Sequence, residues 1–261
     1  MKCVMEMDSE LFLELKEAIE KAVEESCRGE RVGVLFSGGL DSTLIAHLAK
    51  RYAAGVELFT AGMEDAPDMA WAVKIAAELK LPLNVSVLAE EDVLDLYGEV
   101  SMLVPGDLLK VELGVPLLAC CKDARRRKVK AMLSGSGAEE LFGGYRRHWE
   151  EFEKGGDVGA MLRRELEDLP LGDARRNAQV AASEGVEVRC PLLDEEVGKL
   201  AMMVPVEEKF ADEKERKGVL RRIARELGVP AEACARPKQA LQYGSGVHRV
   251  LLKRLGGKAP R

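Results

Sequence analysis

The chain has 261 residues, of which 47% are apolar and 32% charged, a length and mixture that suit a globular protein with a sizeable core. No run of about 18 apolar residues occurs and the N-terminus lacks the layout of a signal peptide, so we expect a cytoplasmic protein without a membrane span. The net charge of -6 makes nucleic acid an unlikely main partner, and the six cysteines form no C-x-x-C pair, which favours reduced thiols over a metal site.

Residues 9–52 predict a helix, a buried strand and a second helix. Apolar side chains recur with helical spacing over residues 9–27, and Gly29 follows as a plausible end of that helix. Residues 31–36 are largely aliphatic and alternate little, as expected of a strand that is covered on both faces. The next helix is expected from about Asp41 to Tyr52.

The same alternation continues to residue 137. We expect a strand over residues 55–62, a helix over 67–80, a strand over 81–88, a helix over about 111–126 and a strand within 128–137. Strands that alternate with helices of about ten to fifteen residues predict an α/β fold with a doubly wound, mainly parallel sheet. Strand signals become few after Tyr145. We therefore expect one domain over residues 1–261, with an N-terminal helix in 1–30, an α/β core in 31–145 and a helical part in 146–261.

Three polar or glycine-rich segments follow predicted strands, at residues 37–42, 61–68 and 134–145. In doubly wound sheets ligands bind beyond the carboxyl ends of the strands, where such segments gather. The first segment reads S-G-G-L-D-S, and glycines before a helix N-terminus let backbone N–H groups approach an anion. It lacks both the lysine of a Walker loop and the G-x-G-x-x-G spacing. From two glycines alone, an ordinary strand-to-helix turn explains the segment equally well.

The full S-G-G-L-D-S pattern resembles the pyrophosphate loop of the N-type ATP pyrophosphatases, and other segments narrow the resemblance to the synthetase domain of the asparagine synthetase family. Residues 58–79 resemble that family's adenine-side strand and helix. S-G-S-G-A-E-E-L-F-G-G-Y at residues 134–145 is similar to its S-G-E-G-A-D-E-L-F-G-G-Y signature. Residues 187–197, 217–230 and 236–246 resemble later motifs of the family, in the same order. The resemblance implies a sheet of the adenine nucleotide α-hydrolase type, also called HUP.

The resemblance also implies that the chain binds ATP. The backbone around five loop residues would hold the phosphates: Ser37, Gly38, Gly39, Asp41 and Ser42. The backbone of Phe36 and of Ala61 would contact the adenosine. Ser134 and Gly135 would close the adenosine pocket from the side of the third segment.

Mg²⁺ is the second ligand that the resemblance implies. Asp41 and Glu139 would face the metal, and Lys238 matches a lysine that stabilises charge on the phosphates or on the tetrahedral intermediate. Simpler explanations of the same residues stay open. The two acids can serve only to favour a helix N-terminus, and Lys238 can be a surface lysine that follows a turn proline.

Some residues depart from the family pattern. Ser136 occupies the place of a glutamate that is linked to adenylate formation and to the incoming amine, and a hydroxyl cannot act as a carboxylate base near neutral pH. Glu139 replaces an aspartate, and Ala178 stands where many relatives have an aspartate. Because the phosphate-side residues are kept and acceptor-side residues differ, ATP binding is a firmer expectation than asparagine as the product.

The source of the amine is a further departure. Only residues 1–30 precede the first predicted strand, and they predict a single helix, so we expect no complete glutaminase domain with Cys3 as its nucleophile. Free ammonia, another amine or a separate glutaminase subunit would then supply the nitrogen.

The favoured prediction is an ATP-dependent carbon–nitrogen ligase of the asparagine synthetase type. It would activate a small-molecule carboxylate as an acyl-adenylate, release pyrophosphate and pass the acyl group to ammonia or an amine. Two alternatives stay open. A nucleotide- or tRNA-modifying ATP pyrophosphatase is disfavoured by the acidic charge and by the lack of a reactive cysteine pair. A non-catalytic ATP-binding subunit is suggested by Ser136 and Glu139.

Overall fold

The computed structural model describes residues 7–104, 108–210, 216–237 and 241–255. Its first half alternates strands and helices: α1 (Ser9–Cys27), β1 (Arg31–Leu35), α2 (Leu40–Tyr52), β2 (Gly55–Met63), α3 (Pro67–Leu79), β3 (Leu83–Leu88), α4 (Glu90–Leu103), α5 (Leu108–Arg126) and β4 (Ala131–Leu133). Its second half is mainly helical: α6 (Ala138–Phe142), α7 (Arg146–Glu153), α8 (Val158–Asp168), α9 (Asp173–Ser183), β5 (Glu187–Arg189), the 3₁₀ turn η1 (Pro191–Leu193), α10 (Glu195–Met203), α11 (Val206–Lys209), α12 (Gly218–Glu226), α13 (Ala231–Ala235), α14 (Leu241–Gly244) and α15 (Val247–Leu255).

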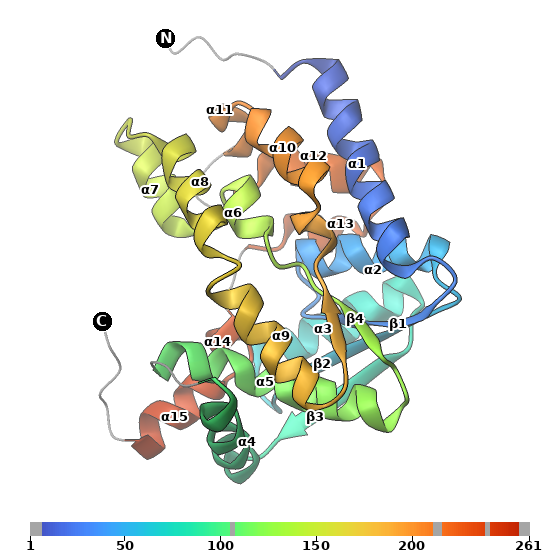
Figure 1. The fold of residues 1–261 in the computed structure, drawn as a ribbon, viewed down its shortest axis with the longest axis vertical. Coiled ribbons are helices and arrows are strands. Elements are labelled where there is room, and N and C mark those ends of the chain that lie inside the picture. The colour runs from blue at the N-terminus through green and yellow to red at the C-terminus, as the bar shows by residue number, and fades with distance from the viewer. Residues whose placement is uncertain (1–6, 105–107, 211–215, 238–240, 256–261) are drawn as a thin grey trace.

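The five strands form one parallel sheet in the order β3-β2-β1-β4-β5 (Figure 1). The predicted α/β fold with a doubly wound parallel sheet is therefore confirmed. Strands β2 and β3 lie on one side of β1, and β4 and β5 lie on the other, so the direction of strand addition reverses at β1. Such a reversal leaves a crevice beyond the carboxyl ends of the two strands, where open α/β sheets bind ligands.

Alternate side chains of the strands enter two separate hydrophobic cores. Val32 and Val34 of β1 pack in a core with α1, α2, α3, α10, α12 and α13. Phe59 of β2 and Met132 of β4 pack in a second core with α4, α5, α9 and α15 on the other face. Burial on both faces explains why β1 shows no polar alternation in the sequence.

Two elements were not predicted from the sequence. Helix α4 lies against α5, and its buried residues Val93, Leu96 and Val100 have helical spacing. Strand β5 has three residues, pairs with β4 and buries none of its side chains fully. Glu187 is exposed and the other two residues are half-buried, so the sequence carries no periodic signal. The strand forms because a neighbouring strand offers backbone partners. No helix in the described part of the chain combines the length and apolar character needed to cross a membrane.

Gly33 at the centre of β1 gives a test of this packing. A Cβ at this position would lie 3.0 Å from both Phe59 and Met132, so Gly33→Val overfills the second core and should lower the free energy of unfolding by about 1–3 kcal/mol. Urea unfolding followed by circular dichroism measures the change. Gly55→Val is the matched control, because a Cβ there meets only the Arg31 side chain at 3.7 Å. Equal stability of the two variants would contradict the packing described.

Candidate functional site

The segment between β1 and α2 forms a glycine turn at the carboxyl edge of the sheet. Gly38 has a φ of +68°, and a Cβ there would lie 2.8 Å from the backbone oxygen of Trp71, so only glycine fits. The Ser37 hydroxyl accepts a hydrogen bond from the Gly39 N–H, and Ser42 donates to the Gly39 carbonyl. The turn delivers the chain into the first turn of α2, whose N–H groups and dipole favour an anion.

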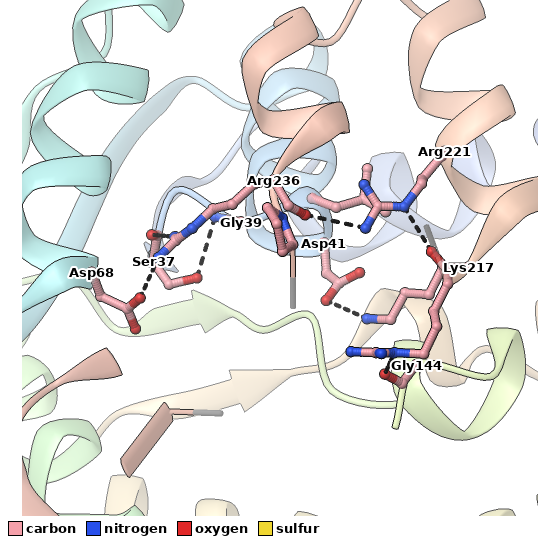
Figure 2. Close-up of a pocket in the computed structure, with 11 residues that line it drawn as sticks. Ser37, Gly39, Asp41, Asp68, Gly144, Lys217, Arg221 and Arg236 are labelled. Atoms are coloured by element: carbon pink, nitrogen blue, oxygen red, sulfur yellow. Dashed lines mark hydrogen bonds and ion pairs between the residues drawn. The ribbon is translucent and has the colours of Figure 1, made fainter. Parts of the chain in front are cut away.

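A pocket lies beside this turn, and residues from both halves of the chain line it (Figure 2). The turn and the start of α2 contribute Ser37, Gly39, Leu40 and Asp41. The other lining residues are Asp68, Gly144, Arg216, Lys217, Arg221, Arg236 and Pro237. Four of the described lining side chains are cationic and two are carboxylates. The pocket therefore suits a ligand with several negative charges.

Lys217 connects the two acids that the sequence predicted to face a metal. Its Nζ lies 2.7 Å from Oδ2 of Asp41 and 2.8 Å from Oε1 of Glu139. Lys217 immediately precedes α12 and has a φ of +64°, and its side chain is only 4% exposed. A buried ammonium needs charge partners, and these two carboxylates provide them.

Two glycines leave room for the acids. A Cβ on Gly135 would lie 2.8 Å from Cβ of Asp41, and a Cβ on Gly144 would lie 1.6 Å from Oε2 of Glu139 and 2.3 Å from Cε of Lys217. Neither position tolerates a side chain while the acids keep these positions. The predicted site residues Asp41, Gly135 and Glu139 are therefore brought together from two separate strand-to-helix connections.

Arg221 fixes the backbone on either side of the pocket. Its guanidinium donates hydrogen bonds to the carbonyl oxygens of Arg216, Cys234 and Arg236. It thereby ties the segment that carries Lys217 to the segment before Pro237. Because these acceptors are backbone atoms, the contact positions both segments whatever their side chains do.

Arg236 ties the second segment to the glycine turn. Its guanidinium donates to the backbone oxygen of Ser37 and pairs with the carboxylate of Asp68 (Figure 2). It also lies over the ring of Trp71 at 5.1 Å. The Arg236 and Asp68 side chains are 6% and 8% exposed. A buried ion pair of this kind fixes geometry, since either charge alone would be costly in the interior.

Behind the pocket, Glu140 forms a second buried contact. It accepts a hydrogen bond of 3.0 Å from the Tyr145 hydroxyl. Burial raises the pKa of Glu140 above its usual range, and burial together with the nearby Glu140 carboxylate raises the pKa of Tyr145. Arg147 lies 4.0 Å over the Tyr145 ring. These contacts support the short helix that presents Glu139.

Helix α6 is also held at its end by a buried lysine. Lys209 is 1% exposed and donates hydrogen bonds to the backbone oxygens of Leu141 and Ala201. Burial, with a smaller contribution from Arg163, lowers the pKa of Lys209 to about 8. The C-terminal ends of α6 and α10 are thus tied to one ammonium group.

Ser136, which was predicted on the acceptor side, lies in a neutral polar cluster with Ser134, which was predicted to close the adenosine pocket. The hydroxyls of Ser134 and Ser136 lie 2.9 Å apart, and Nδ2 of Asn177 lies 3.5 Å from the Ser136 hydroxyl. Cys190, which follows β5, hydrogen-bonds to Ser136, and burial raises the pKa of its thiol. No carboxylate takes part in these contacts of Ser136, so hydrogen bonding is what this side chain offers a ligand.

Phe36 and Ala61, which were predicted to contact the adenosine, lie near the same edge of the sheet. Phe36 is buried and donates its N–H to the Phe59 carbonyl, while Ala61 is buried near the carboxyl end of β2. Lys238 lies outside the described residues, so its predicted role stays a prediction.

The charged residues of the pocket other than Asp41 were not predicted from the sequence as site residues: Asp68, Arg216, Lys217, Arg221 and Arg236. One signal for Lys217 exists in the sequence, because it opens a strongly amphipathic helix at the end where the helix dipole disfavours a cation. A lysine at such a place needs acids from elsewhere in the chain. For the buried Arg236–Asp68 pair, which joins positions 168 residues apart, the sequence carries no comparable signal.

The Arg236–Asp68 pair supplies a test of the site's construction. Asp68→Ala leaves the buried guanidinium without its carboxylate and should lower the free energy of unfolding by about 3–5 kcal/mol. Asp65→Ala is the matched control three residues earlier, in the turn before α3, because its pair with Arg249 is exposed and should contribute no measurable stability. Thermal and urea unfolding compare the two variants. If Asp68→Ala lowers the free energy of unfolding as little as the control does, the Arg236–Asp68 pair does not hold the pocket together.

The family model and the relatives that match the chain belong to the asparagine synthetases, which the sequence motifs also resemble. The family model described as asparagine synthase matches residues 14–156 and 147–257. A putative glutamine-hydrolysing asparagine synthetase of Methanocaldococcus jannaschii is 31% identical over 95% of this chain and 52% of its own length. Asparagine synthetase B of Escherichia coli, also glutamine-hydrolysing by name, is 26% identical over 89% of this chain and 45% of its own. The chain thus spans about half the length of these relatives.

Among solved structures, the NMN synthetase of Francisella tularensis aligns over 96% of this chain and 97% of its own, with 14% identity and a TM-score of 0.41. The NH₃-dependent NAD synthetase of Campylobacter jejuni aligns over 98% and 99%, with 15% identity and a TM-score of 0.38. The family match covers nearly all of the chain and includes every segment that builds the pocket. The chain belongs to the asparagine synthase family.

Proposed function

We propose that the chain is an ATP-dependent amide-forming synthetase that activates a carboxylate as an acyl-adenylate. The observation that carries the proposal is the pocket beside Ser37–Asp41, where a helix N-terminus and four cationic side chains surround a glycine turn. Such a pocket matches the triphosphate of ATP in charge and in hydrogen-bond donors. Membership of the asparagine synthase family supports the same reaction class.

The metal expected with ATP fits the residues present. Asp41 and Glu139 offer carboxylate oxygens, the ligands that Mg²⁺ prefers, and Oδ1 of Asp41 is buried without a hydrogen-bond partner among the described residues. The ammonium of Lys217 already lies between the two acids, so this position favours a cation. Mg²⁺ held there would neutralise charge on the phosphates.

The proposed reaction has two steps, and no covalent bond to the protein forms in either. In the first, a substrate carboxylate oxygen attacks the α-phosphorus, the bond to the β-phosphate oxygen breaks, and pyrophosphate leaves. Arg216 and Lys217 line the pocket where that negative charge develops, and fixed cations stabilise it without reorganisation. In the second, an amine attacks the acyl carbon, AMP leaves with the bridging oxygen, and the amine loses a proton to solvent or base.

The carboxylate would bind beside the neutral cluster at Ser136 and Asn177. These side chains can hydrogen-bond a substrate but cannot take up a proton as a carboxylate does. Aspartate is the first candidate because of the family. The nitrogen would come from free ammonia, another amine or a separate glutaminase subunit, and a cytoplasmic site of action is part of the proposal.

One alternative function has an observation in its favour. A non-catalytic ATP-binding role is compatible with Ser136, since the described residues place cationic side chains beside the glycine turn while Ser136 contacts only neutral polar groups. ATP binding without turnover, whatever acid is supplied, would favour this alternative.

Pyrophosphate release from Mg·ATP tests the proposal. We expect release that depends on one member of a panel of carboxylic acids, aspartate included, measured with and without ammonia. Asp41→Asn should lower the rate roughly 100-fold or more, because it removes one of the two charges that hold the cations at the phosphates.

The control for Asp41→Asn is Glu91→Gln. Glu91 is an exposed acid in the first turn of α4 and shares only the helix-dipole position with Asp41. Circular dichroism confirms that both variants are folded. Unchanged turnover of folded Asp41→Asn would sink the assignment of this pocket.

A further inference from the structure

The contact of Lys217 with the two acids has a consequence for how metal and nucleotide bind. Its ammonium lies between Asp41 and Glu139, the acids that the proposed function assigns to Mg²⁺. Figure 2 shows the contact with Asp41. An ammonium and a divalent cation compete for the same carboxylate oxygens and repel each other at close range. The two cations therefore exclude each other from the space between these side chains.

Hydrogen bonds hold the backbone of Lys217 in place, whereas its long side chain can change conformation. Its carbonyl accepts the Arg221 N–H at 2.9 Å, and the neighbouring carbonyl of Arg216 accepts from the Arg221 guanidinium. The four-carbon stem ends in a group with rotatable donors, so the ammonium can change partners without backbone movement. The ammonium is thus a tethered cation: it can move with its side chain while its backbone stays in place.

The rest of the pocket also disfavours a metal ion that arrives alone. Its described lining carries four cationic side chains, those of Arg216, Lys217, Arg221 and Arg236, against the two carboxylates of Asp41 and Asp68. A free divalent cation meets this positive field, whereas the complex of Mg²⁺ with ATP carries net negative charge. The same lining that repels the free metal attracts the metal–nucleotide complex.

We propose that Lys217 is a tethered cation that occupies the Asp41–Glu139 pair in the absence of nucleotide and yields it only to Mg²⁺ that arrives with ATP. The released ammonium then pairs with phosphate oxygens in the same pocket. This inference rests on the proposed function and adds an order to it: metal and nucleotide enter together, and the free metal does not load the site first.

Binding of Mn²⁺, a paramagnetic substitute for Mg²⁺, tests the order directly. The free Mn²⁺ signal in electron paramagnetic resonance is measured with the full chain, without nucleotide, for the wild type and for Lys217→Met. Removing the tethered cation frees the carboxylate pair, so the variant should bind Mn²⁺ about tenfold or more tightly than the wild type, in proportion to the fraction of sites that Lys217 blocks. Lys217→Arg keeps a cation and should show no such gain.

Lys199→Met is the control, because this lysine is 66% exposed and its ion pair within the described part of the chain is with Glu196. It should leave Mn²⁺ binding unchanged. Equal Mn²⁺ affinity of folded Lys217→Met and the wild type would overturn the inference and leave a purely structural ion pair. If Lys217→Met does not fold, the wild type decides alone: tight Mn²⁺ binding without nucleotide overturns the inference, and weak binding that ATP strengthens supports it.

A parallel measurement separates this inference from the proposed function. Binding of Mg·ATP to the wild type is followed by calorimetry under the same conditions. Failure to bind Mg·ATP contradicts the proposed function and the inference together. Normal Mg·ATP binding combined with unchanged Mn²⁺ affinity of Lys217→Met contradicts the inference alone.

Discussion

The ion pairs of one ammonium group hold the candidate site together. Lys217 joins the start of α2, through Asp41, to the start of α6, through Glu139, and it comes from a third part of the chain. Because the three groups are largely buried, the attraction is screened less than at the surface. Removing Lys217 would leave the two carboxylates without this cation, whereas removing one acid would leave Lys217 paired with the other.

The fold brings these groups together through strand order and backbone contacts. The reversal of strand order between β1 and β4 opens the crevice in which both acid-bearing connections meet. Arg221 then joins two segments of the C-terminal half by donating to their backbone carbonyls. Arg236 fastens that half to the edge through the Ser37 carbonyl and Asp68. A site that depends on main-chain acceptors tolerates much change in the surrounding side chains. This agrees with relatives that are only 26–31% identical over most of the chain.

The sequence predicted the parts of the structure that depend on local pattern. The strands at residues 31–36, 55–62 and 81–88 were expected from apolar runs, and the glycine turn at Ser37–Ser42 was expected from its motif. Strand β5 was missed because its three residues, one exposed and two half-buried, have no period, and its existence depends on β4. Lys217 was missed because its partners Asp41 and Glu139 lie 176 and 78 residues away. Long-range ion pairs of this kind are properties of the fold.

The transfer of ¹⁸O from a labelled carboxylate tests the central claim most directly. If the carboxylate attacks the α-phosphorus of ATP bound at this pocket, completed turnover leaves one ¹⁸O atom in the phosphate of AMP and none in pyrophosphate. Mass spectrometry of the two products reads the result. Turnover that forms the amide while AMP stays unlabelled would contradict activation through an acyl-adenylate.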